Sequence, residues 1–362
     1  MFIIIVVFLI TLTVLVFVHE LGHFLMAKLF GIRVDEFAIG FPPKILSKKI
    51  GETKYSINLI PFGGYVKIWG EDPEEGVVMN EQDRKKNLSF APRWKQAVIL
   101  LSGIFFNIVF AWIFISISLN IGLVSTKTEN SPLDIKDTRV MIVSVLDKSP
   151  AEMSGLKIGD RIVTVNSKPA DSIISVQQEI LAKDKVLLTY ERAGNQYIVE
   201  VVGKEGIVEN KKAIGISMEM VGVAQYGFLK SFWVGAKLTV LETKNIAIGL
   251  KGFIIKIFTP GGNALSNVSG PVGLAKMSGD AMKFGISYFF GFVSMISINL
   301  ALINLIPFPA LDGGRVFLLV IEAVIRRKIK PIIFNILNGV GFILLMILMV
   351  VITVKDVFAL FK

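Results

Sequence analysis

Two histidines and a glutamate near the N-terminus have the types and spacing needed to bind a metal ion. The segment reads Val18-His19-Glu20-Leu21-Gly22-His23, a His-Glu-x-x-His pattern. On a helix, residues i and i+4 lie on one face, so His19 and His23 can present two imidazoles to one ion. Glu20 lies one step round the helix and can hold and deprotonate a metal-bound water. An ordinary, purely structural pair of histidines is the alternative. It fits an apolar segment poorly, because buried ionisable groups in membrane helices are costly.

The remaining ligand must offer oxygen, because the chain has two histidines in total and no cysteine. For zinc, that oxygen most often comes from a carboxylate. Asp312 is the candidate, since it follows a segment in which Pro307 and Pro309 break an apolar helix and free backbone groups. Two interpretations of Asp312 stay open at this point: the N-cap of the next helix, or the missing metal ligand.

The elements that carry these residues are long apolar helices. The 362 residues are 53% hydrophobic and 19% charged, which predicts a membrane protein with one soluble module. Four stretches are long enough to span a bilayer: residues 2–30, 98–122, 285–306 and 332–354. The first is not expected to be a signal peptide, because no basic region precedes it and no small-residue cleavage site follows it.

The distribution of charge predicts the orientation of the spans. The net charge is +10, and its Lys and Arg clusters follow the first and third spans. By the positive-inside tendency both connections are cytoplasmic, and the soluble module and both termini lie outside. Topology alone then brings His19, His23 and Asp312 to one depth near the cytoplasmic face. This distribution indicates membrane flanks, so no nucleic-acid partner is expected.

A β-hairpin is expected after the first span. Residues 55–60 alternate like a strand, residues 61–64 can turn, and residues 65–69 can return. The hairpin is either a surface ornament or an edge strand on which an extended peptide could be held.

The soluble module is expected at residues 125–205, where strand patterns flank a short helix and turn at Ser149–Asp160. The pattern resembles a PDZ domain, a fold that binds extended peptides by strand addition. Residues 227–258 carry a lysine at every seventh position, which predicts an amphipathic helix on the membrane surface. The predicted organisation is a membrane core at 1–124, the PDZ domain at 125–205, a linker and surface helix at 206–283, and a second membrane core at 284–362.

Taken together, the motifs resemble the site-2 protease family of intramembrane metalloproteases, in its bacterial PDZ-containing branch. The shared segments, in the family's order, are His19–His23, Gly63–Lys67, Gly270–Gly273 and Asn304–Gly313. One departure is Gly103-Ile104-Phe105-Phe106-Asn107, where relatives often have Gly-Pro-x-x-Asn. Another is the single PDZ-like module, where some relatives have two.

The resemblance implies Zn²⁺ held by His19, His23 and Asp312, with Glu20 as the catalytic base. It also implies residues that bind the substrate: Asn304, Pro307, Pro309, Asn107, Asn58, Gly63, Gly64 and Tyr65. The implied fold is a polytopic α-helical membrane protein with four transmembrane helices, a membrane re-entrant β-hairpin and one inserted PDZ domain.

The function expected on this basis is an intramembrane zinc endopeptidase in the bacterial cytoplasmic membrane. Its substrates would be single-span membrane proteins such as anti-sigma factors or remnant signal peptides. The outward-facing PDZ module would bind a peptide C-terminus or exclude substrates with large outer domains. The alternatives are a non-catalytic PDZ scaffold in the membrane, which gives no reason for Asp312 beside two prolines, and a metal transporter. A transporter usually needs a polar path, which the second and fourth spans lack.

Overall fold

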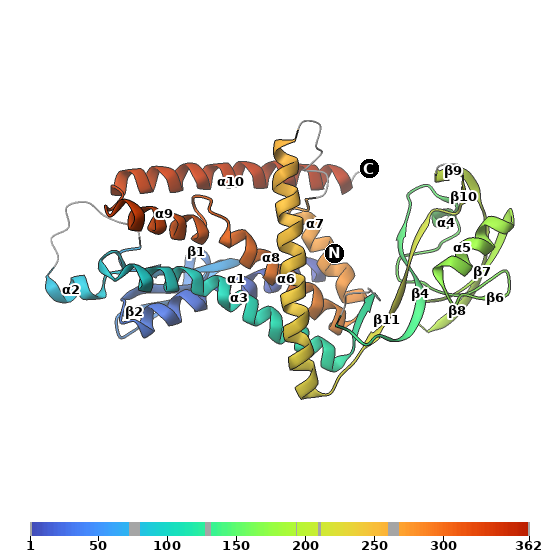
Figure 1. Cartoon of the computed structure of the whole chain (residues 1–362), viewed down its shortest axis with the longest axis horizontal. Helices are drawn as coiled ribbons and strands as arrows, with labels where there is room; N and C mark the ends of the chain where they lie inside the picture. Colours follow the sequence, from blue (N-terminus) through green and yellow to red (C-terminus); the bar gives the residue numbers. More distant parts are fainter. Residues whose placement is uncertain are drawn as a thin grey trace. The chain divides into compact units, whose positions relative to one another are not determined.

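The computed structural model describes residues 2–71, 80–126, 132–192, 194–208, 211–259 and 268–360. The chain divides into two compact units (Figure 1). We call Met1–Ile115 with Gly235–Lys362 the membrane unit, and Ser116–Val234 the β-rich unit.

Four helices of the described chain are long and apolar enough to cross a membrane, as predicted. They are α1 (Phe2–Leu29), α3 (Arg93–Ile121), α8 (Ile286–Leu305) and α10 (Pro331–Leu360). Helix α3 begins five residues before the predicted span, because Arg93 and Lys95 join its first turns. Long basic side chains can lie in the first turns of a membrane helix, because their apolar stems lie along the apolar surface while the charged ends stay in water.

Shorter helices lie in the connections between the spans. They are α2 (Glu81–Lys86), the 3-10 turn η1 (Leu88–Phe90), α7 (Pro271–Lys283) and α9 (Asp312–Ile325). Residues 227–258, predicted as a helix, form α6 (Phe228–Phe258). Its position on the membrane surface stays a prediction.

Asp356, near the end of α10, holds the start of α7. Its Oδ2 accepts hydrogen bonds from the backbone N–H groups of Gly270 and Gly273, both at 2.8 Å. The first N–H groups of a helix have no partner within the helix, and a carboxylate satisfies them in both hydrogen bonding and charge. The Gly-Pro-Val-Gly motif is therefore where α10 and α7 are joined.

The sheet of the membrane unit consists of two long, bent strands, β1 (Val34–Ile50) and β2 (Thr53–Ile68). They pair in three stretches. The pairing is antiparallel between 44–50 and 53–58 and between 34–39 and 64–68, whereas 36–41 and 54–60 run in the same direction. The order across the sheet is therefore 44–50, 53–58, 34–39 and 64–68. Its open edges are the stretches 44–50 and 64–68.

The hairpin predicted within residues 55–69 is wrong. Its two halves do not pair with each other, because each pairs with β1 from an opposite side. The tight turn lies earlier, at Gly51, where φ is +61°, a value that favours glycine. Gly40 and Gly63 also have positive φ, and they permit the bends that let two strands form a sheet four stretches wide.

The β-rich unit consists of short strands, paired antiparallel, and two small helices. The strands are β3 (Leu123–Thr126), β4 (Lys136–Val145), β5 (Arg161–Val165), β6 (Lys168–Pro169), β7 (Lys185–Arg192), β8 (Asn195–Val202), β9 (Lys204–Val208), β10 (Lys211–Ala213) and β11 (Ile216–Ala224). The helices are α4 (Pro150–Met153) and α5 (Ile173–Ala182). The main sheet has the order β3-β11-β4-β5-β7-β8. Its core is a cluster of buried aliphatic side chains that includes Val140, Ile162, Val176, Leu188 and Val201.

The predicted end of this module at residue 205 is too early. Strand β11 pairs with β4 from Ile216 opposite Val145 to Val223 opposite Lys136, so residues 216–224 belong to the sheet. Strand β11 pairs with residues that lie 71 to 87 positions earlier in the chain. Such long-range pairing leaves no mark in the local sequence.

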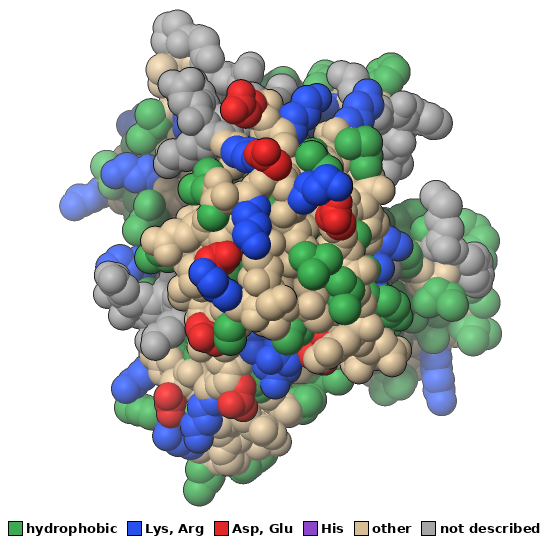
Figure 2. Space-filling view, turned by 90° about the vertical axis from the view of Figure 1, so that its right-hand side faces the viewer, with side chains coloured by type: hydrophobic (Ala, Val, Ile, Leu, Met, Phe, Trp, Pro, Cys, Tyr) green, Lys and Arg blue, Asp and Glu red, His purple; other side chains and the backbone are tan. Residues whose placement is uncertain are grey.

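The surface of the β-rich unit carries charges of both signs. In Figure 2 this unit faces the viewer, and Lys and Arg side chains lie among Asp and Glu side chains. Three ion pairs of this kind are Lys168–Glu179, Lys185–Glu200 and Arg161–Glu191. Interspersed charge is typical of a surface in contact with water.

Candidate metal centre

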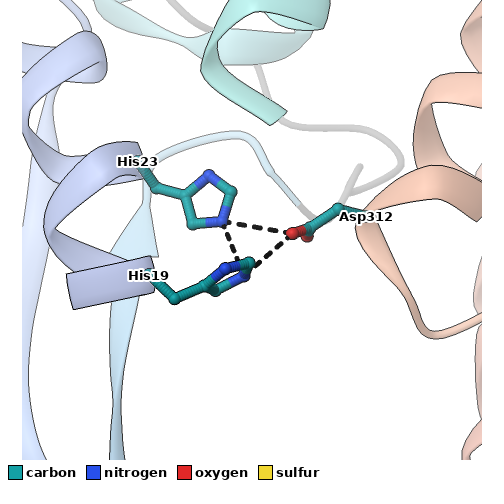
Figure 3. A group of neighbouring side chains, drawn as sticks. All are labelled: His19, His23 and Asp312. Carbon is teal, nitrogen blue, oxygen red and sulfur yellow. Dashed lines mark hydrogen bonds and ion pairs between the residues drawn. The ribbon is translucent and has the colours of Figure 1, made fainter. Parts of the chain in front are cut away.

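Three side chains from distant parts of the membrane unit converge on one point (Figure 3). His19 and His23 lie one turn apart on α1, and Asp312 is the first residue of α9. The Nε2 atoms of the two histidines are 3.2 Å apart. Asp312 Oδ2 lies 2.9 Å from Nε2 of His19 and 3.3 Å from Nε2 of His23. The sequence predicted this convergence.

The spacing of these atoms fits a zinc ion. Zinc bonds of about 2.0–2.2 Å in a tetrahedral arrangement place the ligand atoms about 3.3–3.6 Å apart, close to the distances seen here. Asp312 Oδ2 is buried and lacks a conventional hydrogen-bond donor, which is what a metal-binding oxygen requires. Two imidazoles and a carboxylate leave the fourth tetrahedral position open, as in catalytic zinc sites.

The far side of each imidazole is also held. His23 Nδ1 lies 2.8 Å from the carbonyl oxygen of Ile99 on α3, so it is the protonated nitrogen and leaves Nε2 free to bind. His19 Nδ1 lies 3.2 Å from the side-chain amide of Asn107, which is fully buried on α3. With its amide turned so that Oδ1 faces His19, Asn107 accepts the Nδ1–H, and its otherwise unpartnered Oδ1 is satisfied. Helix α3 thus sets the orientation of both rings.

Asp312 is not the N-cap of α9, so that interpretation is wrong. Leu311 holds the N-cap position, and no side chain caps the helix there. Burial by itself would raise the pKa of Asp312. The neighbouring His19 and His23 side chains outweigh burial and hold the pKa of this carboxyl group below its usual value. The carboxyl group is therefore ionised and available as a ligand.

The turn before Asp312 folds back tightly on the start of α9. A Cβ at Gly313 would lie 2.3 Å from the Leu305 carbonyl oxygen, and one at Gly314 would lie 2.1 Å from that of Phe308. Pro307 and Pro309 lie in this turn, between the end of α8 and the metal ligand. The two glycines after Asp312 thus allow the turn to approach closely enough to direct the carboxylate at the histidines.

Two further glycines bring α1 and α3 together, and their role in packing was not expected from the sequence. A Cβ at Gly103 would lie 2.4 Å from His23 Nε2 and 2.7 Å from His19 Cε1. A Cβ at Gly22 would lie 2.5 Å from the Ser102 carbonyl oxygen. Small residues let membrane helices approach closely. The signal in the sequence was glycine at the centre of an apolar span.

Glu20 contacts the edge of the sheet. Its Oε2 accepts a hydrogen bond of 2.9 Å from the backbone N–H of Val66. Val66 lies in the stretch 64–68, which is one of the two open edges. This bond places the carboxylate between the metal ligands on α1 and an edge strand.

Of the residues expected to bind substrate, Asn304 joins the metal centre. Its Nδ2 lies 3.4 Å from His19 Nε2. The contacts of Asn58, Gly63, Gly64 and Tyr65 lie elsewhere. Asn58 donates to the Gly40 carbonyl at 2.9 Å, and the ring of Tyr65 stacks on Phe41 with centroids 6.3 Å apart.

Gly63 and Gly64 allow the edge stretch to lie close to α1 and to the neighbouring strand. A Cβ at Gly63 would lie 3.0 Å from the Val16 side chain on α1, and one at Gly64 would lie 2.5 Å from the Ala38 carbonyl oxygen. They set the fit of the edge stretch against α1 and against its neighbouring strand.

Residues 7–348 match the model of peptidase family M50. The chain belongs to this family. It is therefore a zinc metallopeptidase of the site-2 protease type, and its cofactor is Zn²⁺.

Two curated relatives match nearly end to end. "Putative zinc metalloprotease CPE1693" of Clostridium perfringens is 34% identical over 345 residues, covering 95% of each chain. The regulator of sigma-W protease RasP of Bacillus subtilis is 30% identical over 433 residues, covering 98% of each. A solved PDZ domain of an SdrC-like protein from Listeria monocytogenes aligns with 24% of this chain and 93% of its own, at 22% identity and a TM-score of 0.21.

Proposed function

We propose that this M50 peptidase cleaves a peptide bond within the membrane span of another protein. The observation that carries the proposal is the convergence of two imidazoles from one candidate span with a carboxylate that follows another. Hydrolysis of a soluble peptide would not require these ligands to lie on apolar helices. The similarity to a relative named regulator of sigma-W protease supports the proposal.

The proposed roles follow from the geometry. His19, His23 and Asp312 hold the metal, and zinc when bound supplies the Lewis acid that activates water and polarises the scissile carbonyl. Glu20 takes a proton from the attacking water and passes it to the leaving amine. Its hydrogen bond to Val66 keeps the base beside the edge strand.

The edge stretch 64–68 is proposed to hold the substrate as an added strand. A transmembrane helix hides its peptide bonds, so it must unwind before it can be cut. Each backbone group then left unpaired in lipid costs several kcal/mol. Pairing with an open edge offsets this cost. Asn304 and the turn with Pro307 and Pro309 are proposed to contact the substrate on the other side of His19.

Part of the sheet is proposed to enter the membrane. The bend of β1 and the neighbouring part of β2 expose several large apolar side chains. These side chains are Phe41, Ile45, Leu46, Ile57, Leu59, Ile60 and Phe62. Each is more than a third exposed, and a cluster of this kind marks a membrane or interaction surface. The cytoplasmic orientation of the basic connections is part of this proposal; Arg315 on α9 pairs with Glu71 after β2, which supports placing both connections on one side.

The protein is proposed to lie in the bacterial cytoplasmic membrane. Its β-rich unit is proposed to act as a PDZ module on the outer side of that membrane. It either binds the C-terminus of a substrate already cut on that side or excludes substrates with large outer domains. Replacing residues 123–224 with a short Gly/Ser linker separates the two: loss of cleavage indicates binding, and cleavage of untrimmed substrates indicates exclusion. Substrates resembling anti-sigma factors or signal-peptide remnants are the classes to test first.

The variant Glu20→Gln tests the chemistry. We expect it to retain zinc, because Glu20 is not a ligand, and to lose cleavage by several orders of magnitude, because the base is gone. Zinc content and cleavage of a fluorescent single-span substrate in proteoliposomes give the two readings. Retained cleavage would exclude the role of Glu20 and would favour the non-catalytic scaffold, which tolerates this substitution.

A further inference from the structure

A second cavity, separate from the metal centre, lies at the basic end of the membrane unit. Its volume is about 860 Å³, and it is enclosed by η1, the first turns of α3 and α10, and one face of α9. None of the three metal ligands lines it. A cavity of this size is within the range that holds small-molecule ligands.

Among the described residues that line this cavity, cations outnumber carboxylates. Four cations line it: Arg84, Arg93, Arg315 and Lys328. Two carboxylates also line it. Glu71 pairs with Arg315, and Glu322 accepts a hydrogen bond of 2.8 Å from the backbone N–H of Ile329. The balance of two positive charges favours an anionic ligand.

Two long helices begin at the cavity without a capping side chain. Pro92 precedes α3, and its carbonyl accepts from the N–H groups of Lys95 and Gln96. Lys330 precedes α10, and its carbonyl accepts from Ile333 and Phe334. Neither Pro92 nor Lys330 has a side chain that can accept hydrogen bonds from the first turn. The positive ends of both helix dipoles are therefore directed to the same space.

The cavity borders the membrane boundary. The ring of Phe90 lies between two cations, with Arg84 at 4.7 Å and Lys328 at 4.8 Å from its centroid. Phe90 is 45% exposed and Trp94, on the first turn of the α3 span, is 59% exposed. Exposed aromatic rings beside basic residues are typical of the headgroup region. A ligand there would meet cations on one side and apolar span surface on the other.

We propose that this cavity binds the phosphate of an anionic phospholipid from the leaflet in which α3 and α10 begin. Basic pockets between membrane helices bind headgroups of this kind. The charge explains selection of an anion. The adjoining apolar starts of two spans explain why the anion carries acyl chains. A lipid there would link α3, which orients both metal-binding histidines, to α9, which carries Asp312.

The test uses the full-length Glu20→Gln protein in nanodiscs, so its outcome does not depend on cleavage. Phosphatidylglycerol and phosphatidylcholine are supplied at equal amounts, and the lipid that stays bound after transfer to detergent is counted by native mass spectrometry. We expect phosphatidylglycerol to be retained preferentially. The double variant Arg84→Gln, Lys328→Gln should weaken its retention by about 10- to 30-fold. The matched control is Lys85→Gln, because Lys85 is exposed, pairs with Glu81 and does not line the cavity.

Three results would overturn the proposal: equal retention of the two lipids, unchanged retention in the double variant, or displacement of the lipid by inorganic phosphate at the same concentration as short-chain phosphatidylglycerol. The last would identify a site for free phosphate. Zinc content shows whether a variant is folded. If the double variant does not bind zinc, Arg93→Gln replaces it, and the same weakening is expected.

Discussion

The two units differ in how they treat buried polar atoms. In the described chain, four buried side-chain oxygen atoms lack a hydrogen-bond partner: Asn58 Oδ1, Asn107 Oδ1, Ser278 Oγ and Asp312 Oδ2. All four belong to the membrane unit. In the β-rich unit, the buried carboxylate of Asp160 accepts two hydrogen bonds of 2.6 Å from Arg192 and one of 2.8 Å from the Lys157 N–H.

The β-rich unit thus satisfies the hydrogen bonds of Asp160 with its own residues. In the membrane unit, some buried oxygen atoms need a bound metal ion or another partner. A buried polar atom without a hydrogen bond lowers the stability of the fold by about 1–3 kcal/mol, so it is expected where another interaction, such as metal binding, offsets this loss. Two of the four atoms, on Asn107 and Asp312, belong to the metal centre. The comparison predicts that substitutions in the membrane unit act on zinc binding, while those in the β-rich unit act on local folding.

The largest effect is expected from Asp312→Asn. The amide keeps the shape of the carboxylate but removes its charge, so the site loses its anionic ligand. Zinc affinity should fall by more than about 100-fold, beyond the range typical of residues that only support a ligand. Competition with a chelator of known affinity measures it. Unchanged zinc content would contradict the claim that the unpaired oxygen of Asp312 is a metal ligand.

A somewhat smaller loss, on the order of 100-fold in zinc affinity, is expected from Gly103→Ala. The added methyl group would occupy the space of the His23 imidazole, so α1 and α3 must separate or the rings must turn. Gly249→Ala is the control, because a Cβ on Gly249 meets no atom within 4 Å and alanine suits a helix. Equal zinc affinity in both variants would show that α1 and α3 can part without cost.

For Asn107→Leu we expect about a tenfold loss of zinc affinity. Leucine fills the volume but cannot hold the Nδ1–H of His19. Asn299→Leu on α8 is the matched control, because the Asn299 amide donates to the Met295 carbonyl of its own helix. If Asn107 served substrate binding alone, zinc affinity would be unchanged and only cleavage would fall.

The smallest effect on zinc, less than about twofold, is expected from Asp160→Asn. Its effect should be local: loss of the charge-assisted bonds to Arg192 destabilises the β-rich unit by about 1.5–3 kcal/mol. Hydrogen exchange of peptides from β5 and β7 in the full-length protein measures it. Asp184→Asn, which alters an exposed ion pair with Lys212, should have little effect on stability. A change in zinc affinity in Asp160→Asn would contradict the separation of the two units.

The metal centre was predictable because each of its parts leaves a local or compositional mark. The i, i+4 spacing of His19 and His23 is visible in six residues. Elimination required an oxygen ligand, since the chain offers no third histidine and no cysteine. Asp312 was a candidate because it follows two prolines, and the family resemblance implied it as the ligand. The Lys and Arg clusters beside the spans then predicted that the three ligands lie at one depth in the membrane. Gly103 and the Ile99 carbonyl could not be assigned, because their roles arise from the distance between two helices.

The sheets were harder to predict, since strand partners are chosen over long distances. Residues 55–60 and 65–68 were correctly expected to be strands, but the turn expected at 61–64 is part of β2. The partner of both is β1, where Pro42 and Pro43 weaken the strand signal. Strand β11 was missed for a related reason. Its alternation is clear only once β4 is known to be its neighbour.

The bond between Asp356 and the start of α7 has a practical consequence for the end of the chain. Asp356 is six positions before Lys362, so a shortened protein that stops before Asp356 would lose the acceptor for the Gly270 and Gly273 N–H groups. Purification tags should therefore extend the chain beyond its last residue rather than replace its final turns.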